Sequence, residues 1–495
     1  MLFCTKSSPL FAFNDWFDAN IYFTMGKGLM NGRILYVDLI DNKGPLLYLI
    51  YGIAWMFDNT GFFGVYIIQS MFVAISVIYV YRISLIYISN KQIAFLVAIC
   101  SPAPMLIRRF YTSGGDFGGG GPEEFCRGLM VVSLYYFVIF YAKAKEYKPY
   151  HTLIQGALFM CVFLMKFNLV AFWTGFLLSI TCELIYKKKF NFLFKHMTMF
   201  TLGASIIVMP YLIYGIVTRS LGAFWNTYFL YNNIYIHQNW NPALTALRSL
   251  VHIIRLFLGR LDLFLLFIIG LVFVYIVCKT GFIIGYGISL FILFIAVFYT
   301  SIIFATIQIP ITISFIFGMI ALGVLVEKFV KGHKFNMIVM SVAVGLVMSI
   351  TIGMNNLITY ELFLSNKQTA QQQMADIIWQ RTRSDSPTLL EIGGLDSGFY
   401  TAAGIIPDEP YFFVYNVCHD LYPYPRDAQM RSVMEGRSEF VITRTHEPNS
   451  SPNPHEIRRL YDEIHVLQGT GYQSHIFYHL FHIKPEYYFN TLDNP

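Results

Sequence analysis

Ten apolar stretches between residues 62 and 354 restrict the fold of this chain more than any other feature. They cover approximately residues 62–81, 92–107, 124–142, 152–165, 168–186, 197–217, 262–278, 281–300, 305–326 and 336–354. A helix needs about 20 apolar residues to cross a bilayer, and it satisfies its own backbone hydrogen bonds there. We therefore expect an all-α polytopic membrane protein with about ten spans. The short stretches 92–107 and 152–165 are expected to be tilted or partly re-entrant.

The composition excludes the main soluble classes. Charged residues make up 13% of the chain and hydrophobic residues 56%, whereas about 25% of a soluble globular chain is charged. A soluble enzyme, a disordered protein and a nucleic-acid binder are therefore poor interpretations. The net charge of +6 requires no polyanionic partner. The seven cysteines contain no CxxC pair, which argues against a disulfide scaffold or a zinc site.

Acidic residues divide the chain near residue 355. Residues 1–360 contain 12 Asp and Glu, and the last 135 residues contain 17. That last part alternates helical patterns with four short β-like runs, Thr388–Ile392, Tyr411–Tyr415, Phe440–Thr443 and Ile476–Phe481, which is typical of a small α/β domain. We predict a first outer loop with juxtamembrane helices over 1–60, including the apolar run 45–57, a transmembrane domain over 61–355, and an extracytoplasmic α/β domain over 356–495.

Basic residues predict the orientation in the membrane. The alternate loops 82–91, 143–150, 187–196, 279–280 and 327–335 hold 13 Lys and Arg, and such short basic loops face the cytoplasm. Both termini and the α/β domain are then extracytoplasmic. The first 44 residues contain no spanning run and no signal peptide pattern. Either a leading transmembrane helix is missing from this chain or the N-terminus is translocated unaided, and we favour the first.

Eight of the 12 acids in the membrane part fall in two outer loops. The first loop holds Asp15, Asp18, Asp38, Asp41 and Asp58, and the second holds Asp116, Glu123 and Glu124. Asp15 and Asp18 are three residues apart, so a helix would place them on one face. Such carboxylates could accept a proton from a hydroxyl nucleophile or hold a divalent cation. We therefore take Asp18, Asp15, Glu123 and Glu124 as candidate catalytic residues. Asp18 and Glu124 are the candidate ligands if a metal is required.

Three basic residues lie near the outer ends of apolar runs. Lys43, Lys166 and Arg109 are candidates for binding a lipid phosphate at the outer leaflet. The competing interpretation of Lys166 is a lysine that snorkels to the interface. The Gly-rich segment 114–122 lacks the Lys-Ser/Thr of a P-loop.

The first loop resembles that of a known family. The strings Phe13–Tyr22, Gly26–Gly32 and Tyr36–Tyr48 look like the first outer loop of GT-C glycosyltransferases, in particular the bacterial family-39-like membrane proteins. Those proteins are similar to protein O-mannosyltransferases and lipid A aminoarabinose transferases. Their Lys-Pro-Pro-Leu-like step into a juxtamembrane helix corresponds here to Lys43-Gly44-Pro45-Leu46. The resemblance covers roughly residues 10–190. It implies about eleven to thirteen helices, an active site facing outside, and a donor sugar on a polyprenyl phosphate.

The resemblance also implies roles for single residues. Asp18 matches the catalytic acid of the first loop, and Lys43 matches the basic residue near the lipid phosphate. Glu123 or Glu124 matches the second-loop acid, and Lys166 matches a basic residue of a later outer hairpin. Asp18 is followed by Ala, where many relatives have Glu, which weakens the case for a metal.

The favoured function is therefore a glycosyltransferase that moves a sugar from a polyprenyl-phosphate donor to a hydroxyl of a cell-envelope glycan, lipid or protein. Two alternatives stay open. One is a transporter or flippase of a lipid-linked or polar solute, although no internal repeat of the transporter type is visible. The other is a non-catalytic partner in envelope assembly. The sugar, the acceptor, the anomeric outcome and the oligomeric state do not follow from the sequence.

Overall fold

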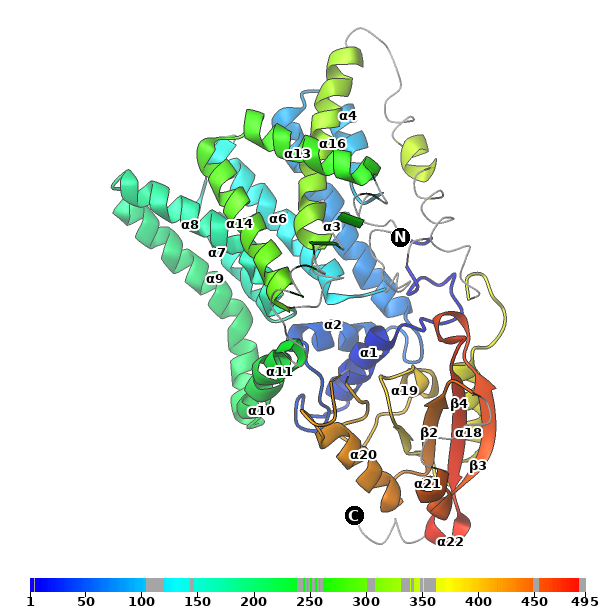
Figure 1. The fold of residues 1–495 in the computed structure, drawn as a ribbon. Coiled ribbons are helices and arrows are strands. Elements are labelled where there is room, and N and C mark those ends of the chain that lie inside the picture. Colours follow the sequence, from blue (N-terminus) through cyan, green and yellow to red (C-terminus); the bar gives the residue numbers. More distant parts are fainter. Residues whose placement is uncertain are drawn as a thin grey trace.

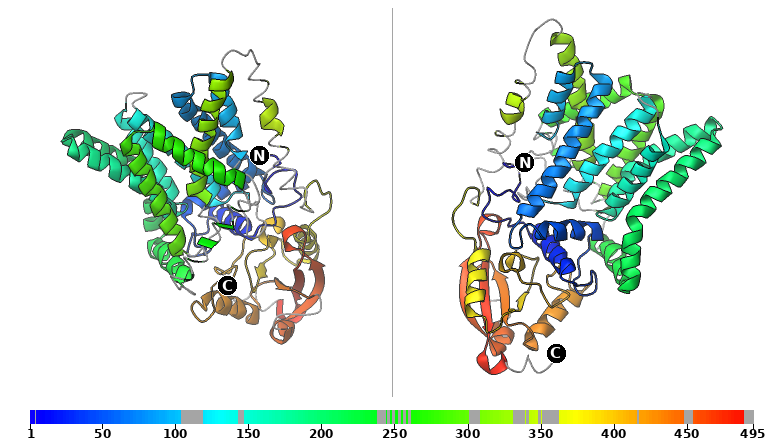
Figure 2. Two further views of the ribbon diagram at one scale, coloured as in Figure 1. Left: turned by 45° about the horizontal axis from the view of Figure 1, so that its top comes forward. Right: turned by 180° about the vertical axis from the view of Figure 1, so that it is seen from behind.

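The computed structural model describes residues 1–3, 5–103, 119–142, 147–237, 261–300, 308–330, 362–415, 417–447 and 454–488, with scattered positions between 244 and 258 and between 339 and 350. A bundle of long helices forms one half of the molecule and a small domain with a β-sheet forms the other (Figure 1). Two short helices, α1 and α2, lie between them in all three views (Figures 1 and 2).

Apolar helices form the bundle. They are α3 (Phe63–Tyr87), α4 (Lys91–Cys100), α6 (Pro122–Ala142), α7 (Pro149–Phe163), α8 (Ala171–Tyr186, after a 3-10 turn at Phe167–Val170), α9 (Phe190–Val217), α13 (Leu261–Val277), α14 (Thr280–Thr300) and α16 (Gln308–Val330). Among the described residues, four segments are long and apolar enough to cross a membrane: Phe63–Tyr87, Pro122–Ala142, Phe167–Tyr186 and Phe190–Val217. They coincide with four of the predicted spans. The predicted span 336–354 falls mostly outside the described residues.

Close helix contacts in the bundle depend on small residues. In α7 a Cβ atom on Gly156 would lie 1.9 Å from the carbonyl oxygen of Phe200, and in α9 one on Gly203 would lie 1.9 Å from that of Leu153. Lipid tails are as apolar as leucine side chains, so membrane helices associate through tight packing of this kind. The two glycines therefore allow α7 and α9 to run in backbone contact.

The helices α1 (Phe17–Met30) and α2 (Pro45–Trp55) lie across the end of the bundle. They cross at Gly26 and Gly52, where a Cβ atom on Gly26 would lie 2.5 Å from the amide nitrogen of Gly52. The helix α2 corresponds to the apolar run 45–57 and begins at Pro45, which suits a first helical position. Three short elements follow α9 at the same end of the bundle: α10 (Leu221–Trp225), a π-helical turn (Asn226–Tyr231) and α11 (Asn232–His237).

The small domain combines a four-stranded mixed sheet with short helices. Its elements are α18 (Ala370–Arg381), β1 (Leu389–Glu391), α19 (Phe399–Ala403), α20 (Tyr424–Met434), β2 (Phe440–Thr445), α21 (Pro454–Leu460), β3 (Tyr461–Gln468), a 3-10 turn (Gly471–Gln473), β4 (Phe477–Ile483) and α22 (Pro485–Tyr488). The strand order is β1-β2-β4-β3. β1 pairs parallel to β2, and the other two pairs are antiparallel. The predicted fold class, a helical membrane domain with a small C-terminal α/β domain, is confirmed.

Two strand assignments differ from the prediction. The run Tyr411–Tyr415 is a loop whose apolar side chains pack inward, with Phe412 and Phe413 fully buried. It packs against the loop between α1 and α2, where the hydroxyl of Tyr415 donates to the carbonyl of Ile40 at 3.0 Å. The strand β3 was not expected, because its charged residues Asp462 and Glu463 lie on an edge strand, where polar side chains are common.

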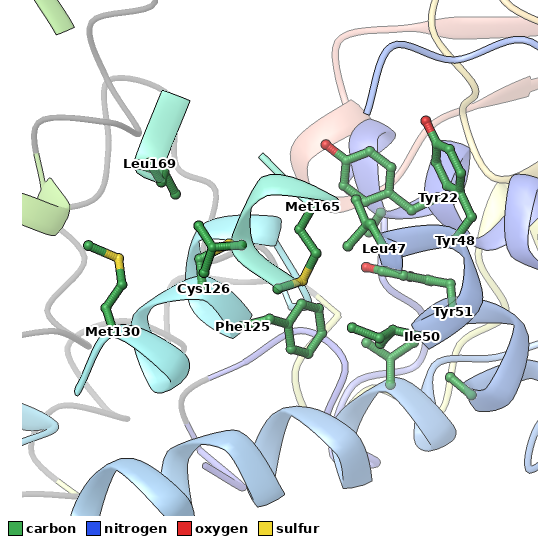
Figure 3. Packing of buried hydrophobic residues seen from close by; sticks show 14 of the residues in the cluster. Tyr22, Leu47, Tyr48, Ile50, Tyr51, Phe125, Cys126, Met130, Met165 and Leu169 are labelled. Atoms are coloured by element: carbon green, nitrogen blue, oxygen red, sulfur yellow. The ribbon is translucent and has the colours of Figure 1, made fainter. Parts of the chain in front are cut away.

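Buried aromatic and apolar side chains connect α1, α2 and the bundle into one core. Figure 3 shows Tyr22 of α1, Tyr48 and Tyr51 of α2, Phe125 of α6 and Met165 within one cluster. The hydroxyl of Tyr51 donates to the carbonyl of Gly120 at 3.0 Å, which satisfies its polar end inside the core. The end of the bundle and the two short helices therefore form a single packed unit.

Candidate active site

A polar cavity of about 180 Å³ opens between the start of α1, the loop before α2 and the start of α6. The segment between α7 and α8 and the elements around α11 complete its wall. Its lining consists of Trp16, Asp18, Tyr22, Asn42, Lys43, Glu123, Met165, Lys166, Phe167, Asn168, Tyr228, Asn232 and Tyr235. Asp18, Lys43, Glu123 and Lys166, all singled out from the sequence, lie together here although up to 148 positions separate them. Larger cavities exist elsewhere in the bundle, but this one combines two carboxylates with two ammonium groups.

Main-chain hydrogen bonds bring the two lysines to one cavity. The amide of Gly44 donates to the carbonyl of Met165 at 3.2 Å, and the amide of Leu46 donates to that of Leu164 at 3.1 Å. Lys43 and Lys166 immediately flank this pairing. A Cβ atom at position 44 would lie 2.0 Å from the carbonyl oxygen of Leu164, so the segments can approach this closely only with glycine there.

Asp18 differs from the other three charged residues of the cavity in its hydrogen bonding. It lies half-buried in the first turn of α1, where the helix dipole favours a negative charge. Its carboxylate has no hydrogen-bond partner among the residues that the structure describes. Burial raises the pKa of Asp18 above its usual value, the nearby Lys43 opposes this shift, and the charges of Asp41 and Glu123 add to it. A carboxylate with a raised pKa and no partner is suited to accept a proton.

Lys43 is held by a chain of amide side chains. Its ammonium donates to Oδ1 of Asn42 at 2.7 Å, and Nδ2 of Asn42 donates to Oδ1 of Asn232 at 3.1 Å. The ammonium also lies 6.0 Å from the centre of the Tyr22 ring, at the outer limit of a cation–π contact. One hydrogen bond to a neutral amide leaves the charge of Lys43 available for an anion.

Lys166 and Glu123 form an ion pair across the cavity wall, with their side chains 15% and 14% exposed. The ammonium of Lys166 thus faces the cavity and a carboxylate. The two charges compensate each other, so this pair contributes orientation and hydrogen-bonding groups with no net charge.

The other sequence candidates lie elsewhere. Asp15 forms a buried ion pair with Lys6, Nζ to Oδ1 2.7 Å. The carboxylate of Glu124 accepts hydrogen bonds from the side chain of Gln69 and from the amide of Gly120, so of the two second-loop acids only Glu123 lines the cavity. Arg109 lies outside the described residues.

Asp18 and Glu124 are the two residues that could hold a metal if one is required, and the structure directs them to different places. Asp18 and Glu124 do not share the cavity, because the Glu124 carboxylate is directed into its hydrogen bonds with Gln69 and Gly120. In the described part of the chain, no group of three or more His, Cys, Asp or Glu is placed to hold a metal ion. We therefore derive no step through a metal.

Several neutral residues of the cavity were not expected from the sequence. Tyr235 and Asn232 come from α11, and Asn168 from the 3-10 turn before α8. Burial raises the pKa of Tyr235, and the charge of Asp18 adds to this. Asn168 carries a buried Oδ1 atom without a hydrogen-bond partner among the described residues. Of these residues, only Asn168 could have been recognised from the sequence, because it lies two residues after Lys166.

An apolar cavity of about 340 Å³ lies next to the polar one. It is lined by Tyr36, Pro45, Phe163, Leu164, Val208, Tyr211, Leu212, Tyr214, Gly215, Ser220, Leu221, Phe224, Trp225 and Phe229. Neighbouring residues line the two spaces: Tyr228 lines the polar cavity, while Phe229 lines the apolar one. The ring of Phe167 contacts the rings of both residues: its centroid lies 5.3 Å from that of Tyr228 and 5.4 Å from that of Phe229.

Comparison with known proteins gives a fold but no sequence family. No family model matches the chain, and no curated protein matches it by sequence. Among solved structures, ArnT from Cupriavidus metallidurans bound to undecaprenyl phosphate is 12% identical, with a TM-score of 0.62 over 97% of this chain and 96% of that one. Its apo state is also 12% identical, with a TM-score of 0.56 over 93% of each chain. The chain therefore has the membrane-protein fold of ArnT over nearly its whole length, as the GT-C resemblance of the first loop predicted.

Proposed function

We propose that this protein is a membrane glycosyltransferase that transfers a sugar from a polyprenyl-phosphate donor to a hydroxyl of a cell-envelope glycan, lipid or protein. The observation that carries the proposal is the placement of the unpartnered Asp18 carboxylate in one cavity with the ammonium groups of Lys43 and Lys166. The structural neighbour that is bound to undecaprenyl phosphate supports the choice of a lipid-phosphate donor.

The charged residues have separate roles in the proposed reaction. The phosphate of the donor binds at Lys43, whose ammonium has one neutral partner, and beside Lys166. The acceptor oxygen attacks the anomeric carbon, and its proton passes to the carboxylate of Asp18. The bond between the anomeric carbon and the phosphate oxygen breaks, and polyprenyl phosphate leaves as an anion. Lys43 stabilises the negative charge that grows on this leaving group, and Lys166 adds a hydrogen-bond donor beside it, so no strong general acid is required.

The apolar cavity supports a donor with an isoprenoid chain. A phosphate at Lys43 would place the first isoprene units near Pro45 and Phe229, which line that cavity. Apolar surface there would be removed from water or from the headgroup layer when the chain binds. A water-soluble nucleotide sugar would leave this surface uncovered.

We place the reaction on the extracytoplasmic side of the membrane. The support is the basic loop containing Lys187, Lys188 and Lys189, between α8 and α9, which lies at the end of the bundle away from α1 and α2 (Figure 1). If that loop is cytoplasmic, the cavity and the α/β domain face outside. Nucleotide sugars are absent there, which favours a lipid-linked donor.

Transfer of a radiolabelled sugar from polyprenyl-phosphate donors in proteoliposomes tests the proposal. The wild-type chain should transfer label to an envelope extract, and Asp18→Asn should bind donor but lose at least about a hundredfold in turnover, on the scale of general-base catalysis. The matched control is Asp420→Asn, an exposed carboxylate of the small domain. Donor translocation without transfer would favour a flippase, and equal turnover in Asp18→Asn would exclude the mechanism.

A further inference from the structure

The small domain contacts the helix that carries Asp18 at both of its ends. We infer that this domain acts as a clamp that sets the position of the Asp18 carboxylate, with Thr24, Asp396 and Gln473 as positioning residues. The inference rests on the proposed function for the role of Asp18. It assigns the small domain a part in catalysis that requires no contact with either substrate.

The first half of the clamp holds the C-terminal half of α1. The hydroxyl of Thr24 donates to Oδ2 of Asp396 at 2.8 Å, and both side chains are fully buried. One turn later, the ammonium of Lys27 enters the small domain and donates to the carbonyls of Tyr400, at 2.7 Å, and Ile405. A buried lysine without such partners would be costly, so these contacts fix α1 against the loop around α19.

The second half of the clamp holds the residue that precedes α1. Nε2 of Gln473 donates to the main-chain carbonyl of Asp15 at 2.9 Å. Asp15 lies next to Trp16, which is the N-cap of α1, and three residues before Asp18. The Trp16 side chain makes no capping hydrogen bond. Local hydrogen bonds from Asn14 and Asn20 hold the first turn together, and Gln473 adds the contact that joins this end of the helix to the small domain.

Gln473 in turn is fixed from within the small domain. Its Oε1 atom accepts from the hydroxyl of Tyr478 at 2.7 Å and from the side chain of Gln371, and its Nε2 atom also reaches the carbonyl of Ser397 at 3.2 Å. Residues from α18, β4 and the loop after β1 thus converge on one fully buried side chain.

Asp396 is fixed in a similar way. Its Oδ1 atom accepts from the amide of Gly398 at 2.8 Å. Gly398 has a φ of +100°, and a Cβ atom there would lie 2.8 Å from the ring of Phe13. The loop can therefore approach the N-terminal segment this closely only with glycine at this position.

Both ends of α1 are thus tied to a rigid domain, which matters because a 14-residue helix is only marginally stable on its own. General-base catalysis is sensitive to geometry, and a misplacement of about 1 Å can cost about a hundredfold in rate. Loosening the clamp should therefore lower turnover while the donor, held at Lys43, still binds. It should also change the environment of Asp18 and so move the acid limb of the pH–rate profile.

Two substitutions at one position test the inference. Thr24→Val removes the hydroxyl at nearly constant volume, and Thr24→Ser keeps it. We expect Thr24→Val to lower kcat by about tenfold or more, while the donor KM stays within about twofold of the wild-type value. The acid limb of the pH–rate profile should shift. Hydrogen exchange should become faster in residues 17–30 but not in α6. Thr24→Ser should restore kcat, the acid limb and the hydrogen exchange of residues 17–30. Gln473→Leu should act in the same direction, and Gln468→Leu, on the edge strand, should not.

The outcomes separate the two proposals. Unchanged kcat and unchanged exchange of α1 in both Thr24→Val and Gln473→Leu would overturn the clamp while leaving the transferase intact. If the Thr24 and Gln473 variants had a lower melting temperature but normal turnover per folded molecule, the two residues would serve stability alone. That result would also overturn the clamp. If the wild-type chain transfers no sugar, the transferase proposal fails, and the exchange of α1 alone then decides whether the domain holds the helix.

Discussion

Lys6 and Asp15 form an ion pair inside the protein, with 2.7 Å between Nζ and Oδ1 and side chains that are 1% and 2% exposed. The pair ties the N-terminal segment to the residue just before α1. Asp15 is buried in this ion pair, whereas Asp18, three residues later, lines the cavity. The two carboxylates therefore have different surroundings: Asp15 is held in an ion pair, whereas Asp18 faces the cavity in which we propose that the reaction takes place.

Removal of one partner of this pair should affect stability more than catalysis. We expect Lys6→Met to lower the free energy of unfolding by about 3–5 kcal/mol, because a buried carboxylate loses its partner. Turnover per folded molecule should stay within a few fold. Thermal unfolding in detergent and transfer assays on the folded fraction measure the two effects. The double variant Lys6→Met/Asp15→Leu should recover part of the stability. A stable Asp15→Asn protein with a hundredfold loss in turnover would instead make Asp15 the base.

The acid limb of the pH–rate profile should move in opposite directions in two variants. Asp18 must be ionised to accept a proton, so activity should fall as the pH drops through its raised pKa. Lys43 lowers the pKa of Asp18 and Glu123 raises it. Lys43→Met should therefore move the acid limb to higher pH, and Glu123→Gln should move it to lower pH. Rates measured between pH 4 and 8 at saturating donor check the signs. Shifts of equal sign would mean that another group controls the limb.

Donor affinity should depend on both Lys43 and Lys166. A charge-assisted contact is worth about 1.5–3 kcal/mol, so Lys43→Met should raise the donor Kd about tenfold or more. Lys166→Met should have a similar effect for a different reason, because it leaves Glu123 as an uncompensated negative charge beside the phosphate. The double variant Lys166→Met/Glu123→Gln should bind donor better than Lys166→Met alone. Lys91→Met, at an exposed position elsewhere, is the control.

Stability of the small domain should fall as the pH rises from about 5 to 7. Burial raises the pKa of Glu391 to about 8; the charge of Asp396 adds to this shift and that of Arg444 opposes it. An acid with a raised pKa in the folded state contributes stability that is full below its unfolded pKa and lost as the pH passes the folded value. Burial also lowers the pKa of Lys27 to about 7, so Lys27 acts only above this window. Glu391→Gln should flatten the dependence of melting temperature on pH, and an unchanged slope would contradict the assignment.

Cysteine labelling can establish the orientation. Cys418 is an exposed cysteine of the small domain. We expect a membrane-impermeant maleimide to label it in intact spheroplasts and Cys418→Ser to remove that signal. A cysteine introduced by Lys188→Cys, between α8 and α9, should react only after permeabilisation. The reverse pattern would place the cavity on the cytoplasmic side.

Apolar stretches of span length and one loop motif were enough to predict the bundle and the four charged residues of the cavity, because span length and charge placement are set by the bilayer itself. Asp18, Lys43, Glu123 and Lys166 were recognisable as charges next to apolar run ends. The choice between Glu123 and Glu124 was not, since it depends on which way each side chain points at the start of α6. The edge strand β3 escaped prediction because its exposure permits polar residues. The contacts of Thr24 with Asp396 join positions 372 residues apart, and no local pattern encodes them.

The main-chain pairing at Gly44 has a consequence for how this site can change through evolution. Lys43 and Lys166 are spaced by hydrogen bonds between their own segments and not by the helices that connect them along the chain, α2, α3, α4, α6 and α7. Insertions or deletions in the loops of that interval can therefore accumulate without altering the separation of the two cations. Position 44 has no such freedom, because even alanine would collide with the carbonyl of Leu164. Divergent descendants of this sequence should vary widely in loop length and still keep a residue there that permits the contact.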